Sequence, residues 1–98
     1  MLNYLRNYMI IAREVKEMLR MMDPQLKVYV FGSIVKGNFT VASDIDMLII
    51  TEAIERKNEM IIETYRRIKA PVELHIASRE KFKSWYMKFI NINDVIEV

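Results

Sequence analysis

The chain has no cysteine and only two glycines and two prolines among its 98 residues. The lack of cysteine excludes both a disulfide framework and a thiolate zinc site. Any bound metal must therefore be held by carboxylate oxygens or by the single histidine, His75. Hard cations such as magnesium match that set of ligands best.

Long hydrophobic runs and a strong net charge are also missing. No window approaches the roughly 18 continuous apolar residues of a membrane span, and the N-terminus mixes charges into its apolar run. We therefore expect a cytoplasmic protein with no membrane partner. The net charge of +2 is too small to indicate nucleic-acid binding. Residues 66–88 are locally basic, which indicates either solvated helix faces or a surface that meets an anionic substrate or acidic partner.

The composition is that of a globular protein, with 52% apolar and 29% charged residues. The length predicts a single minimal domain over residues 1–98, which is compatible with a homodimer. Hydrophobic spacing and proline positions predict helices and strands in alternation, and therefore the α+β class, with one small mixed sheet packed against helices. The expected helices are 2–22, 52–69 and one capped by Ser78 that carries Phe82, Trp85, Tyr86 and Phe89. The expected strands are 26–31, 44–51 and 72–77, and residues 95–98 could add an edge strand or meet a partner.

Both glycines fall in one turn, directly after the first predicted strand. Gly32 and Gly37 can take positive φ and let a ligand approach the main chain, as a turn that binds phosphate requires. Ser33 adds a hydroxyl donor, and Lys36 lies inside the turn, where it could neutralise phosphate charge or simply be solvated. Taken alone, such a segment is more often a plain tight turn between a strand and a helix.

Carboxylates follow this turn at strand spacing. Asp44 and Asp46 leave the same face of an extended segment and could share one cation or bridge two. In the next strand, alternation places Glu73 and His75 on one face, so Glu73 could complete a three-carboxylate site if the strands are neighbours. His75 could contact substrate or act as a base, although a histidine without a metal role is the more common case. Two magnesium ions held there could clamp a triphosphate and activate a hydroxyl.

The residues from Gly32 to Asp46 resemble a known signature. Gly32-Ser33, Gly37 and Ser43-Asp44-Ile45-Asp46 match the pattern GSxxxGxxxxxSDxD of the DNA polymerase β-like nucleotidyltransferase superfamily at every defined position. The short length is similar to the minimal nucleotidyltransferases, which often pair with a helical HEPN protein as a toxin–antitoxin system.

The resemblance implies the nucleotidyltransferase fold and transfer of a nucleoside monophosphate, most simply AMP from ATP, to a hydroxyl such as a tyrosine of a HEPN partner toxin. It implies two Mg²⁺ ions on three catalytic carboxylates, Asp44, Asp46 and Glu73. The nucleotide-binding residues that we assign are Gly32, Ser33, Lys36, Gly37 and Ser43. Relatives commonly have Asp at the third carboxylate, so Glu73 extends one methylene farther.

Two other functions remain open from the sequence. The chain could be an antitoxin that neutralises its partner by burying a surface, with little or no catalysis. It could also modify a small molecule or an RNA end, but such activity favours a second domain or a strong basic stripe, and the sequence shows neither clearly.

Overall fold

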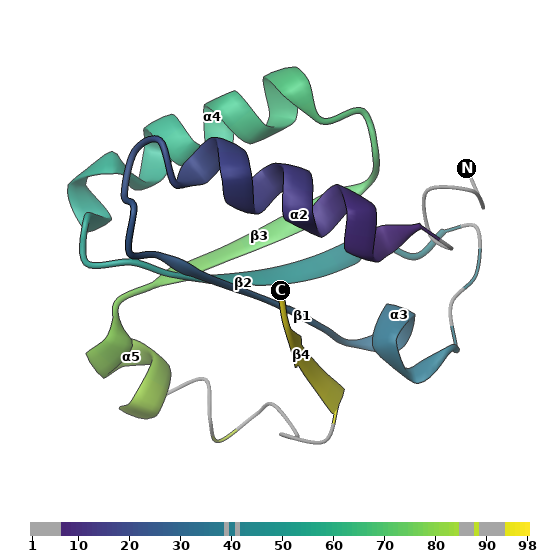
Figure 1. Cartoon of the computed structure of the whole chain (residues 1–98). Helices are drawn as coiled ribbons and strands as arrows, with labels where there is room; N and C mark the ends of the chain where they lie inside the picture. Colours follow the sequence, from purple (N-terminus) through teal and green to yellow (C-terminus); the bar gives the residue numbers. More distant parts are fainter. Residues whose placement is uncertain (1–6, 39, 41, 85–87, 89–93) are drawn as a thin grey trace.

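The computed structural model of the chain describes residues 7–38, 40, 42–84, 88 and 94–98 (Figure 1). Helices and strands alternate along the chain, as the hydrophobic spacing predicts. The elements are α2 (Tyr8–Leu19), β1 (Lys27–Phe31), α3 (Ser33–Lys36), β2 (Ile45–Ile50), the 3-10 helix η1 (Ile54–Arg56), α4 (Lys57–Arg67), β3 (Val72–Ala77), α5 (Arg79–Ser84) and β4 (Val95–Glu97).

The strands form one four-stranded mixed sheet in the order β3-β2-β1-β4. Strand β2 runs parallel to β3, whereas β1 is antiparallel to both β2 and β4. The parallel pair is joined through η1 and α4, because parallel neighbours need a crossover connection. This mixed sheet with its helices confirms the predicted fold class.

Helices α2 and α4 lie on one face of the sheet and form the core with it (Figure 1). The strand residues that point toward them alternate in sequence, including Val28 and Val30 on β1 and Met47 and Ile49 on β2, all fully buried. From the helices, Ala12, Val15, Leu19 and Met60 fill the same layer with no exposed surface. The alternate strand residues therefore belong to the opposite face of the sheet.

Helix α5 lies on that opposite face, where the ring of Phe82 stacks on Tyr29 of β1 at a centroid distance of 6.1 Å and an interplanar angle of 11°. The helix begins as predicted, since the amide of Lys81 donates to the hydroxyl of Ser78 at 3.2 Å. The rest of the predicted aromatic helix, Trp85, Tyr86 and Phe89, lies outside the described residues, as do residues 2–6 of the first predicted helix.

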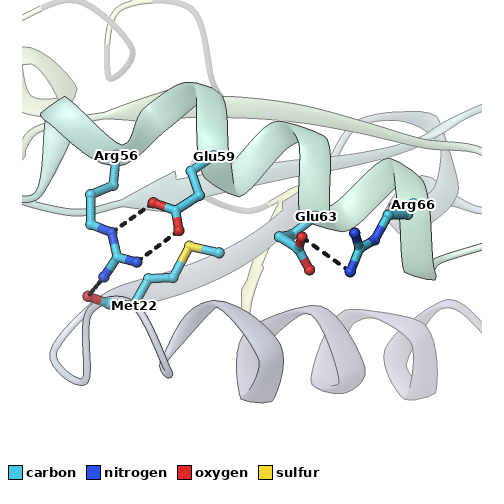
Figure 2. Close-up of polar contacts among 5 residues, drawn as sticks. All are labelled: Met22, Arg56, Glu59, Glu63 and Arg66. Atoms are coloured by element: carbon cyan, nitrogen blue, oxygen red, sulfur yellow. Dashed lines mark hydrogen bonds and ion pairs between the residues drawn. The ribbon is translucent and has the colours of Figure 1, made fainter.

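The segment after β2 differs from the single helix predicted over 52–69. The amide of Ala53 donates to the hydroxyl of Thr51 at 3.1 Å, and a 3-10 turn precedes α4. At the start of α4, Arg56 forms a two-pronged pair with Glu59 and donates to the carbonyl of Met22 at 3.1 Å (Figure 2). The Met22 contact ties this turn to the chain that follows α2.

In the part of the chain that the structure describes, no helix is long and apolar enough to cross a membrane. The predicted edge strand at the C-terminus is present as β4, and it extends the sheet beside β1. The amide of Val98 adds one more bond, to the carbonyl of Val28 at 2.9 Å.

Candidate functional site

The site begins where β1 ends, at Gly32. Its backbone has φ 86° and ψ −157°, a region that is essentially restricted to glycine. Space is a second constraint, because a Cβ atom at this position would lie 2.7 Å from Oδ2 of Asp46. The sequence predicts that a ligand approaches the main chain here, and the structure adds that the carboxylate of Asp46 also lies close to Gly32.

Residues 33–36 form one helical turn, which is anchored by the buried side chain of Ile34. The amides of Val35 and Lys36 donate to the carbonyl of Gly32 at 3.2 and 3.3 Å, so these two amides are used within the turn. Gly37 ends it in the left-handed conformation, with φ 79°. A Cβ atom at Gly37 would meet nothing within 4 Å, so only its backbone conformation calls for glycine.

Lys36, in this turn, forms an ion pair with Asp94. Its Nζ lies 3.5 Å from Oδ2 of Asp94, just before β4, and the two side chains are 49% and 28% exposed. An exposed ion pair of this kind contributes roughly 0–1 kcal/mol, so Asp94 holds Lys36 only weakly.

Ser43 and Asp44 lie just before β2. The hydroxyl of Ser43 accepts the amide of Thr40 at 2.9 Å, which closes a turn ahead of the strand. The amide of Ile45 donates to the carbonyl of Pro71 at 2.7 Å and fixes the start of β2 beside the start of β3. Asp44 is exposed at this point.

Strand register brings Asp46, Glu73 and His75 together. Asp46 lies opposite Glu73 on β3 and opposite Phe31 on β1, and His75 is two residues farther along β3. Nε2 of His75 is 3.8 Å from Oδ1 of Asp46 and 3.7 Å from Oε1 of Glu73. One donor atom from each of the three residues fits within 4.8 Å of the other two, a grouping that could hold a metal ion.

The imidazole of His75 is held against both carboxylates and an aromatic ring. The side-chain interaction with Asp46 raises the pKa of His75, burial opposes this, and the negative charges of Glu73 and Asp46 add to the increase. The ring lies 5.3 Å from that of Phe31 at a tilt of 58°. His75 therefore faces the acidic groups across the sheet surface.

The structure brings some of the predicted site residues together. Asp46 and Glu73 meet, and Gly32 borders Asp46, whereas Asp44 is not part of the three-residue cluster found among the described residues. His75 joins the cluster, although the sequence favoured a role without a metal. Alternation along 72–77 places His75 on the face of Glu73, but only the register with β2 shows that both meet Asp46.

This donor set fits a divalent cation, because carboxylate oxygens and an imidazole nitrogen are both ordinary ligands for such ions. A glycine turn beside carboxylates near the ends of the strands of a mixed sheet is an arrangement suited to phosphoryl chemistry. The fold and the site together fit a transferase of phosphorylated substrates. The family model of the nucleotidyltransferase domain matches residues 9–98, and the chain belongs to that family.

Solved structures agree with this assignment. The fold resembles a protein described as a candidate nucleotidyltransferase, with a TM-score of 0.69 and 27% sequence identity, over 88% of this chain and 95% of that one. It also resembles a candidate nucleotidyltransferase from Sulfolobus solfataricus, with a TM-score of 0.65 and 22% identity, over 98% of this chain and 83% of that one. The second likeness shows the fold alone. No curated protein matches the chain.

Proposed function

We propose that this nucleotidyltransferase transfers AMP from ATP to a hydroxyl of a separate protein, a tyrosine of a HEPN-type partner toxin. The observation that carries the proposal is the meeting of Asp46, Glu73 and His75 beside the turn at Gly32, in a chain of the nucleotidyltransferase family. The nucleotide, the acceptor and the partner follow from the resemblance of the signature over residues 32–46.

The reaction joins the acceptor oxygen to the α-phosphorus of ATP and breaks the bond between that phosphorus and the oxygen bridging to the β-phosphate. Pyrophosphate leaves with that electron pair, and the hydroxyl proton passes to a carboxylate or to water. Two Mg²⁺ ions, when bound, neutralise phosphate charge and lower the pKa of the attacking hydroxyl. Asp46 and Glu73 would hold them, and Asp44, exposed at the entry to β2, would supply the third carboxylate.

The turn would bind the triphosphate. Because the amides of Val35 and Lys36 already donate to Gly32, the amides of Ser33 and Ile34 and the hydroxyl of Ser33 are the donors that we assign to phosphate. Lys36 would exchange its weak pair with Asp94 for a phosphate oxygen. Ser43 would act through the turn that it closes before Asp44.

The proposal is tested by following which phosphate of ATP is transferred to protein. The chain is incubated with MgCl₂, a clarified lysate of its host and ATP labelled at either the α- or the γ-phosphate. Protein labelling from α-labelled ATP alone, at a tyrosine that gains the mass of one AMP, is the expected result. Labelling from γ-labelled ATP would mean kinase chemistry. Equal labelling by the Asp46→Asn variant would mean that the carboxylate of Asp46 takes no part in the transfer.

A second candidate function is neutralisation of a partner by binding alone. It is favoured by two exposed apolar side chains on α4, Ile62 at 63% and Tyr65 at 53% exposure, which offer a surface for another protein. Co-expression with a HEPN-type partner separates the two functions. Neutralisation that survives Asp46→Asn and fails with Ile62→Asp would favour binding, whereas the reverse pattern would favour catalysis.

A further inference from the structure

His75 supplies the one donor atom of the cluster that is not an oxygen. The resemblance implies a metal site built from carboxylates, so this nitrogen lies outside that pattern. Its Nε2 lies at nearly the same distance from Asp46 and from Glu73, at 3.8 and 3.7 Å. It therefore lies about equally close to both carboxylates.

The imidazole is also fixed in position. His75 is opposite Leu48 on β2, a residue with no exposed surface, and its ring contacts Phe31 across β2 at a centroid distance of 5.3 Å. A strand backbone and an aromatic neighbour together restrict where the ring can go. The site nevertheless stays open to solvent, since the side chains of His75 and Glu73 are 29% and 53% exposed. A cation can reach it without unfolding of the sheet.

The kind of donor decides which cation is preferred. Mg²⁺ is bound mainly through oxygen, whereas imidazole nitrogen suits first-row transition ions. Manganese belongs to that series and, like Mg²⁺, also suits carboxylate oxygens. Two oxygens and one imidazole nitrogen are therefore a better match for Mn²⁺ than for Mg²⁺.

We propose that His75 is a direct nitrogen ligand and that it makes one metal position of this site prefer Mn²⁺ over Mg²⁺. The proposal rests on the proposed function only in using the same site. The imidazole lies close to the carboxylates of both Asp46 and Glu73. The alternative role is a positioning one, in which His75 hydrogen-bonds Asp46 and never binds the ion.

The chain has a single histidine, which makes the test unambiguous. Protein without a histidine tag is loaded with MnCl₂ alone, and pulsed electron paramagnetic resonance is used to detect ¹⁴N coupling from an imidazole bound to Mn²⁺. We expect this coupling in the native chain and its loss in His75→Gln, which keeps a hydrogen-bonding side chain without the imidazole lone pair. Titrations with MnCl₂ and MgCl₂ should show that the affinity for Mn²⁺, relative to that for Mg²⁺, falls at least about tenfold in the variant.

Mn²⁺ binding without ¹⁴N coupling, no Mn²⁺ binding at millimolar concentration, or an unchanged affinity ratio in His75→Gln would overturn the proposal. Circular dichroism checks that the variant folds, and if it does not, the coupling in the native chain decides the matter. Because no nucleotide is present, the result is independent of the proposed function. If the native chain shows the ¹⁴N coupling but does not bind ATP, only the proposed function is overturned. If it binds ATP but shows no coupling, only the role of His75 as a metal ligand is overturned.

Discussion

A Cβ atom at Gly32 would lie 2.7 Å from Oδ2 of Asp46. A side chain at position 32 would therefore overlap the carboxylate of Asp46 on β2, and glycine avoids the overlap because it has no side chain. This couples two parts of the site that are separate in the sequence, the proposed phosphate turn and the proposed metal ligand. A change in the turn should consequently alter metal binding as well as stability.

Substitution of the two glycines tests that coupling. Gly32→Ala should lower the free energy of unfolding by about 1–3 kcal/mol, because ψ −157° with positive φ is strained for alanine. It should also displace Asp46 and weaken Mn²⁺ or Mg²⁺ binding. Gly37→Ala is the matched control, with a backbone cost of about 1–2 kcal/mol and open space around its Cβ. Denaturant unfolding and metal titration of both variants check this, and equal metal affinity in the two would refute the coupling.

Two buried threonines should respond differently to removal of their hydroxyls. Thr51, 2% exposed, donates to the carboxylate of Asp23 and accepts the amide of Ala53. Thr51→Val removes the hydroxyl from both partners, so we expect the free energy of unfolding to fall by about 1–3 kcal/mol.

Thr64 provides the comparison, because its hydroxyl donates only to a carbonyl in its own helix, that of Met60, at 2.8 Å. That carbonyl has a regular backbone partner one turn later. Thr64→Val should therefore change stability by less than about 1 kcal/mol. Urea unfolding of both variants measures the difference. A larger loss of unfolding free energy in Thr64→Val than in Thr51→Val would contradict the greater contribution that we assign to the Thr51 hydroxyl.

The ion pair between Lys36 and Asp94 predicts opposite effects on nucleotide binding. Lys36→Met should weaken ATP binding, whereas Asp94→Asn should strengthen it, because Lys36 is then released from its partner. The gain should be less than about fivefold, since exposed ion pairs contribute roughly 0.2–1 kcal/mol. ATP titration in the presence of Mg²⁺ measures both. Weaker binding in Asp94→Asn would mean that the pair holds the turn in its binding conformation.

Much of the fold could be predicted from local patterns. The strand predicted over 72–77 matches the observed bounds of β3, and Ser78 caps α5 as expected. The helix predicted over 52–69 was interrupted instead, because Thr51 bonds the amide of Ala53 and delays the first α-helical turn. Helical spacing of apolar residues does not record such a side-chain bond to the backbone.

The site could be predicted only in part, since its contacts depend on strand register. The sequence places Glu73 and His75 on one face, yet the parallel pairing of β2 with β3 is what sets Glu73 opposite Asp46. The ring contact of His75 with Phe31 joins β3 to β1 across a strand and has no local signal. The pair of Lys36 with Asp94 likewise joins segments that no periodicity relates.

The most direct test of the account is calorimetric titration of the chain with ATP, with and without MgCl₂, alongside two variants. Asp46→Asn changes one carboxylate of the cluster, and Glu55→Gln changes an exposed carboxylate of η1 as the control. We predict Mg²⁺-dependent ATP binding in the native chain and in Glu55→Gln, and its loss in Asp46→Asn. ATP binding that needs no Mg²⁺, or that is unchanged in Asp46→Asn, would contradict a metal-dependent nucleotide site at Asp46.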